Sequence, residues 1–249
     1  MISTYDVVAP PRVPRTRNEA ILHFLVQTHI QIEKLRMATN GQYSSLLKQG
    51  VDGPHIDQVQ QRTREFEEWL EAEMERLVVG HPAWPWLSQV KGVGMENAGK
   101  VIAFIGDIAR FPTVSKLWSY AGYGVENGEA PRRAKGQKTT WNENLGVMCW
   151  RLGVSLIRAR GAYYHYYLEV KGMYEHRYEG RIVKAKKGNP MPVGVITAKH
   201  IHNMAVRRMM KLFLSHLWEV WREAEGLPVR APYAIDKLGC ATPIEPFIG

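Results

Sequence analysis

Apolar residues recur at helical spacing through most of the chain, and this periodicity is the feature that most constrains the fold. In residues 18–40 they fall near a period of 3.6, and similar spacing continues over about 56–79, 143–170 and 195–225. Alternating patterns typical of strands are few, and no internal repeat is evident. The sequence therefore predicts an all-α protein.

The first two helical segments predict a hairpin over about residues 18–80. The first segment is expected to end at Asn40-Gly41, because glycine favours a helix stop. On one side the second segment carries Val59, Phe66, Leu70, Met74 and Leu77. The pair fits an internal hairpin packed on the body, and equally a coiled coil that joins copies of the chain into a homo-oligomer. Residues 1–17, rich in Pro and Arg, predict a flexible basic arm.

A cluster of helix breakers follows the hairpin and marks a predicted domain boundary. Gly80 and Pro82 interrupt the helical pattern, and we expect residues 81–228 to form a second domain. Its expected parts are a short helix at 113–122, an exposed loop at 124–142, one helix at 143–170, a second loop at 179–194 and a last helix at 195–225. Residues 229–249 show no regular pattern and predict an irregular tail.

Near the start of this domain, residues 86–111 predict a helix-hairpin-helix element whose turn is Lys91-Gly92-Val93-Gly94. The two glycines permit positive φ on either side of Val93, whose side chain we expect in the core. The hairpin amides and the N-terminus of the following helix would then face outward. They suit a phosphate group, whatever base it carries. Lys91 and Lys100 are expected to add direct charge.

The positive charge of the chain is concentrated after the predicted boundary. Residues 1–80 carry 9 Lys and Arg against 11 Asp and Glu, whereas residues 130–211 carry 17 against 4. Such a patch attracts phosphate polyanions by releasing their condensed counterions. A basic face that merely keeps the protein in solution is the alternative, and the concentration of charge favours nucleic acid.

Three groups of basic residues are the remaining candidates for nucleic-acid contacts. The first lies on the Gly-containing loop, the second beside a Tyr-rich segment that suits stacking on unpaired bases, and the third on the loop at 179–194. In that order the groups are Arg132, Arg133, Lys135 and Lys138; Arg158 and Arg160; and Lys184, Lys186 and Lys187. On a helix the tyrosines at 163, 164, 166 and 167 cannot all face one way, so we expect at least half of them to pack inside.

Other classes of function find little support in the sequence. No apolar run of about 18 residues exists, so no membrane span is expected. Cys149 and Cys240 form no CxxC motif, which argues against a disulfide scaffold or a structural zinc site and favours the cytoplasm, with nucleoid association. His200 and His202 lie two apart on a helix and so point apart. We therefore predict no metal, no cofactor and no catalytic residue.

A series of short motifs also resembles a known family. The motifs are His81-Pro82, Val90-Lys91-Gly92-Val93-Gly94, Ala103–Ile108, Arg110-Phe111 and Tyr120-Ala121-Gly122, followed by Gly136, Asn144, Arg151, Arg158 and Lys171-Gly172. In order and spacing, they make residues 81–222 resemble the C-terminal domain of the insertion-sequence transposases of class one hundred and ten and its sister class one hundred and sixteen. The helix pair before His81 resembles that family's coiled-coil connector. The resemblance implies a helix-hairpin-helix domain that binds nucleic acid.

The chain departs from the family's pattern in two places. The family's RuvC-like N-terminal domain, which carries four acidic metal ligands, has no counterpart in residues 1–80, where no βαβ pattern occurs. The family's nucleophilic serine follows the Tyr-Ala-Gly segment, and here Asn127 stands where we expect it. An amide cannot attack a phosphodiester. The resemblance thus implies binding without transposase chemistry.

Together these observations predict a non-catalytic DNA-binding protein that holds duplex or branched DNA by its backbone, largely without sequence preference. One alternative is a recombinase or nuclease subunit with an unrecognised nucleophile or an active site supplied by a partner. Another is an RNA-binding subunit, because the family's guided members engage an RNA.

Overall fold

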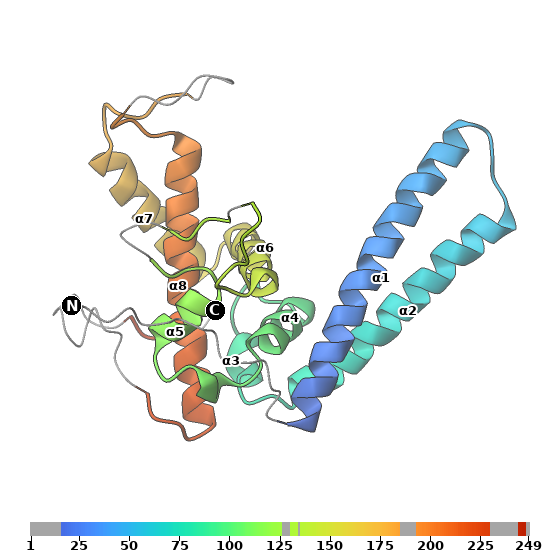
Figure 1. Cartoon of the computed structure of the whole chain (residues 1–249), viewed down its shortest axis with the longest axis horizontal. Coiled ribbons are helices and arrows are strands. Elements are labelled where there is room, and N and C mark those ends of the chain that lie inside the picture. Colours follow the sequence, from blue (N-terminus) through green and yellow to red (C-terminus); the bar gives the residue numbers. More distant parts are fainter. Residues whose placement is uncertain (1–15, 126–129, 134, 185–192, 230–243, 248–249) are drawn as a thin grey trace.

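Figure 1 shows a computed structural model of the chain, which describes residues 16–125, 130–133, 135–184, 193–229 and 244–247. Within these ranges the secondary structure is helical, apart from one isolated bridge between Ile182 and Ile196. The helices are α1 (Arg17–Lys48), α2 (Pro54–Val79), α3 (Trp84–Leu87), α4 (Met95–Ile105), the 3-10 helix η1 (Ile108–Arg110), α5 (Val114–Tyr120), α6 (Glu143–Ala159), α7 (Ala162–Arg177) and α8 (Ala198–Ala224). The all-α prediction is confirmed.

Helices α1 and α2 pack against each other and project from the body as an arm (Figure 1). Thr16 and Glu19 form a capping box that begins α1. The prediction that this helix ends at Asn40-Gly41 is wrong, because α1 continues to Lys48. A glycine inside a helix costs only about 1 kcal/mol, so it does not by itself end a helix that is formed on both sides of it. Farther along the arm, Arg36 pairs with Glu67 on α2 through two hydrogen bonds.

The base of the arm packs on α4, so the buried core runs without a break across Gly80. A Cβ atom at Gly99 would lie 3.2 Å from Val78 and 3.3 Å from Met74, which shows how closely α4 approaches α2. Nearly every residue of α4 is buried. The two predicted domains thus share one core. Their division at Gly80 stays a prediction.

Helix α8 is the central helix of the body and is buried along most of its length. It holds the segment after α4 through side chains that bond to backbone carbonyls. Trp218 Nε1 donates to the Phe111 carbonyl at 2.7 Å, and Arg222 donates to the carbonyls of Ile108 and Phe111 at 3.3 and 3.2 Å. In the described part of the chain, no helix combines the length and the apolarity needed to cross a membrane.

The segment predicted as one helix over 143–170 is two helices, α6 and α7. Arg160 ends α6 in the left-handed conformation, with φ of 55°, and Gly161 precedes α7. Arg160 is the one residue other than glycine with positive φ among those described. The break lets α7 turn back and pack along α8. We call residues 158–161 the α6–α7 junction.

Residues 244–247 of the predicted irregular tail contact the core. Trp86 Nε1 donates to the Phe247 carbonyl at 3.1 Å, and the Phe247 ring packs against the rings of Tyr163 and His216. His216 is buried, and its Nε2 donates to the Ile244 carbonyl at 2.8 Å. With that tautomer its Nδ1 accepts from the Tyr163 hydroxyl at 2.7 Å. Burial lowers the pKa of His216 to about 4, so the ring is neutral at pH 7.

Candidate nucleic-acid interface

The turn between α3 and α4 has one strained glycine, not two. Gly92 adopts φ of 100°, whereas Gly94 is extended, with φ of −81° and ψ of 166°, and caps α4. Val93 between them is buried, as predicted, and its amide donates to the Val90 carbonyl at 3.0 Å. The expectation that both glycines turn the chain is therefore wrong, because Gly92 alone needs the left-handed region.

This turn packs directly on the C-terminal end of α6. A Cβ atom at Gly92 would lie only 2.8 Å from the Ala159 Cβ, and the Ser155 hydroxyl donates to the Gly92 carbonyl at 2.7 Å. In the same way, a Cβ atom at Gly161 would lie 2.9 Å from the Lys91 Cβ. Two segments that are more than 60 residues apart in the sequence are thus fixed against each other.

As a result, three of the predicted basic residues lie on one surface, which we call the hairpin face. It consists of Lys91 and Gly94 from the turn and Arg158 and Arg160 from the α6–α7 junction. All four residues are exposed. No side chain caps the N-terminus of α4 at Gly94, so the first-turn amides there have no side-chain partner. Amides at a helix N-terminus and nearby cations together favour an anion.

Lys100 does not belong to this surface. Its side chain is buried, and its ammonium group pairs with Glu96 on α4 and, at 3.2 Å, with Glu33 on α1. The prediction that Lys100 contacts a phosphate is therefore wrong, because its charge is used to join the arm to the body. Glu96 is an acid just after the turn, and its pair with Lys100 balances its charge within the protein.

The other predicted basic groups lie elsewhere. Arg132, Arg133, Lys135 and Lys138 are exposed before the first turn of α6, where Arg133 pairs with Glu143 at 3.4 Å. The hairpin face lies at the opposite end of this helix, about 24 Å away at 1.5 Å per residue. Lys184 is exposed, and Lys186 and Lys187 lie outside the described residues. The structure thus gathers two basic groups at the two ends of α6.

The tyrosines that follow Arg160 pack largely inside the protein. Tyr163 and Tyr167 are buried, and the Tyr167 hydroxyl is 2.7 Å from Nδ1 of His202. Tyr164 and Tyr166 are half-buried against the core. The prediction that at least half of these rings pack inside is confirmed.

A cavity of about 580 Å³ beside the N-terminal end of α6 contains residues that the sequence analysis did not single out. Its walls include the rings of Tyr123, Trp141 and Trp150, together with Arg133 and Arg207. The helical pattern of α6 holds a signal for it. Leu145, Leu152 and Leu156 define the buried side, and Trp150 falls on the opposite side, where a large aromatic residue is unusual.

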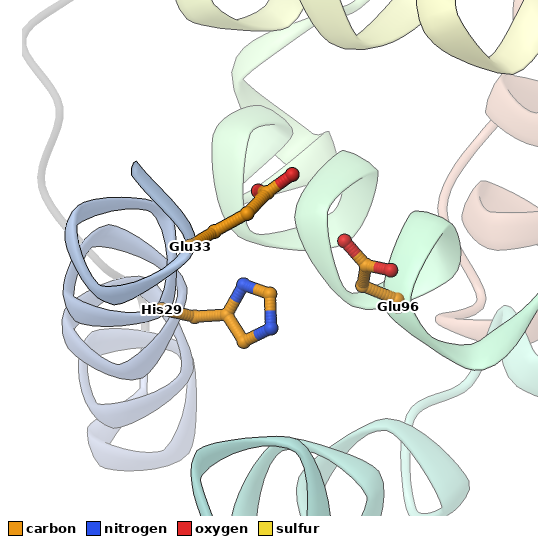
Figure 2. A group of neighbouring side chains, drawn as sticks. All are labelled: His29, Glu33 and Glu96. Atoms are coloured by element: carbon orange, nitrogen blue, oxygen red, sulfur yellow. The ribbon is translucent and has the colours of Figure 1, made fainter. Parts of the chain in front are cut away.

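One cluster has the side chains of a metal site. His29 and Glu33 on α1 and Glu96 on α4 point toward one another, as Figure 2 shows, and their ligand atoms lie within 4.8 Å of one another. His29 is buried and its Nδ1 has no hydrogen-bond partner. The Lys100 ammonium, however, already pairs with both carboxylates. We assign no metal to the cluster, because a cation there would have to displace Lys100.

Comparison with known proteins gives a short similarity. The chain matches no protein-family model. It is 42% identical over 53 residues to an uncharacterised 43.6 kDa protein of insertion element IS110 from Streptomyces coelicolor. The matching segment is 21% of this chain and 13% of that protein's length. The similarity supports a relationship, at this coarse level, to the transposase-related family that the sequence motifs resemble.

Proposed function

We propose that the protein is a non-catalytic DNA-binding protein that grips the phosphate backbone with its hairpin face, largely without sequence preference. The observation that carries the proposal is the packing of Gly92 on Ala159 and of Lys91 on Gly161. These contacts hold Lys91, Arg158 and Arg160 beside the uncapped N-terminus of α4. A rigid set of cations and backbone amides is the arrangement that binds phosphate.

The loop before α6 supplies a second contact with the same backbone. The two basic groups are about 24 Å apart, which corresponds to about seven nucleotides along one strand at 3.4 Å each. Both groups present Lys and Arg side chains, which position a strand through its phosphates but do not read its sequence. DNA held at two points in this way keeps its base edges free for another protein.

The similarity to an insertion-element protein supports a role connected with a mobile element. It also favours a second candidate function, in which this chain is the DNA-holding subunit of a recombinase whose active site lies in a partner. Both candidates make the same prediction for the chain alone. Alone with labelled duplex or junction DNA and Mg²⁺, the protein should bind without cleaving or forming a covalent adduct. Cleavage by the chain alone would contradict the non-catalytic proposal, and tighter binding to RNA would favour an RNA-binding subunit.

The hairpin face is tested by neutralising two of its charges. We expect Lys91→Gln with Arg158→Gln to weaken binding to unrelated duplexes by similar factors. Each lost phosphate contact should make the negative slope of log K against log salt less steep by about 0.9. Fluorescence anisotropy at several salt concentrations measures both quantities.

Lys48→Gln with Arg62→Gln is the matched control, because both residues are exposed in the outer part of the arm, near the turn between α1 and α2. It removes two positive charges from the surface and should leave the slope unchanged. An equal loss in the control would assign binding to net charge alone. A sequence-selective loss in the double variant would contradict the backbone grip.

A further inference from the structure

The cavity beside α6 combines aromatic rings with arginine side chains. Tyr123 comes from the segment after α5, Trp141 from just before α6, Trp150 from the middle of α6 and Arg207 from α8. Its volume, about 580 Å³, is within the range of about 300 to 1,000 Å³ that is usual for sites of small molecules. Trp150 remains 60% exposed and the adjoining Val147 55% exposed, so the apolar wall is open to solvent.

The walls of the cavity are fixed by contacts within the protein. Arg207 donates to the carbonyls of Gly122 and Gly124 at 3.1 and 2.6 Å, and its guanidinium carbon lies 5.1 Å from the centre of the Tyr123 ring. Gly122 has φ of 78°, and a Cβ atom there would lie 2.9 Å from the Trp141 ring. The Trp141 indole therefore packs directly against the backbone of Gly122. A preformed aromatic wall of this kind stacks on a planar ligand without first losing side-chain freedom.

The charges around the cavity identify the ligand. Arg133 and Arg207 are in its wall, and Arg132, Lys135 and Lys138 are exposed on the adjoining loop. Glu143 is the one acid among the described lining residues, and Arg133 pairs with it. The cavity thus offers stacking surfaces inside and positive charge at its rim. A nucleotide has the same arrangement, with a planar base and an attached phosphate.

We infer that this cavity binds an unpaired base of the DNA strand whose backbone the protein holds. The inference rests on the proposed function and makes it more specific. A base that is paired and stacked in a duplex is not available to the cavity, whereas a base in a single strand or at a branch is. The protein therefore prefers DNA with an unpaired segment to a continuous duplex, and Trp150 is the exposed ring that stacks on the base.

The test compares two labelled DNA molecules, a continuous duplex and the same duplex with a single-stranded extension. Trp150→Ala should weaken binding to the extended molecule by roughly 5- to 150-fold, the range for loss of one base–aromatic stack. Its binding to the continuous duplex should stay unchanged. Trp150→Phe should restore most of the preference, because an aromatic face remains. In the native protein, 2-aminopurine in the extension should change fluorescence on binding, and Trp150→Ala should remove that change.

Trp69→Ala is the control, because Trp69 is 51% exposed on α2 in the arm and away from the cavity. It should alter neither affinity. An equal loss on both DNA molecules with Trp150→Ala, or no loss on the extended one, would overturn the inference while leaving the backbone grip intact. If the native protein binds neither molecule, the proposed function fails, and the base site fails with it.

Discussion

Gly92 and Gly94 lie two residues apart in the same turn, and we predict that they have separate roles. At Gly92 any other residue would have to adopt φ of 100°, which costs roughly 1–2 kcal/mol for left-handed backbone. A new Cβ atom would also lie 2.8 Å from the Ala159 Cβ and 3.1 Å from the Leu156 Cα. Overpacking of this kind adds about 1–3 kcal/mol. Gly92→Ala should therefore lower the free energy of unfolding by about 2–5 kcal/mol.

At Gly94 neither cost applies. Its backbone is extended, a conformation that any residue can adopt, and a Cβ atom there would have no neighbour within 4 Å. Gly94→Ala should change the free energy of unfolding by less than about 1 kcal/mol. Gly94→Val should likewise keep the fold, but its branched side chain would cover the amides at the start of α4. We expect it to weaken binding to unrelated DNA sequences by similar factors.

Urea unfolding followed by circular dichroism measures the difference. With a slope near 3 kcal/mol per M, the Gly92→Ala midpoint should fall by about 0.7 to 1.7 M, and the Gly94→Ala midpoint should hardly move. The reasoning would be refuted if the two alanine variants were equally stable. If Gly94→Val unfolded the protein instead of weakening its binding, the assignment of Gly94 to the binding surface would also be wrong.

Two further predictions concern charge and pH. Lys100→Met should lower the free energy of unfolding by about 1.5–3 kcal/mol, because it removes the buried ammonium group that pairs with both Glu33 and Glu96. Burial acts to raise the pKa of Glu33, but Lys100 and Arg151 outweigh it and hold that pKa below 4.5. The native protein should therefore lose this stabilisation as the pH falls below 4.5. The Lys100→Met variant should show a smaller fall in its urea midpoint over the same pH range. Burial lowers the pKa of His81 and of His216 to about 4, so the unfolded chain binds more protons between pH 6.5 and 4. Stability should fall across that range by up to about 3 kcal/mol for each histidine, and a midpoint that is constant from pH 7 to 4.5 would contradict this.

The helices of the fold could be predicted from the sequence because their apolar spacing is regular. One error came from giving too much weight to a local signal: Gly41 resembles a helix stop, yet α1 continues through it to Lys48. The break at Arg160 was missed because a tertiary contact accompanies it. Arginine is not a residue that usually ends a helix in the left-handed conformation, and it does so here where the turn at Gly92 packs against Ala159.

The candidate site could be predicted only in part. Sequence patterning identified Lys91 and the buried Val93, because glycines and apolar neighbours mark the turn. It could not tell that Lys100 is buried, since the partner Glu33 is 67 residues away in the chain. Nor could it join Arg158 to the turn, or place Arg207 beside Trp141, because both depend on how distant helices pack.

The arm and the body differ in the sequence distance of the contacts that form them, and this has a consequence for synthesis on the ribosome. Helices α1 and α2 are neighbours in the chain and can pair once about 80 residues have emerged. The segment around Phe111, in contrast, is held by Trp218 and Arg222, which are made more than 100 residues later. Nascent chains should therefore form the arm first, while the apolar residues around Phe111 stay uncovered until α8 has left the exit tunnel.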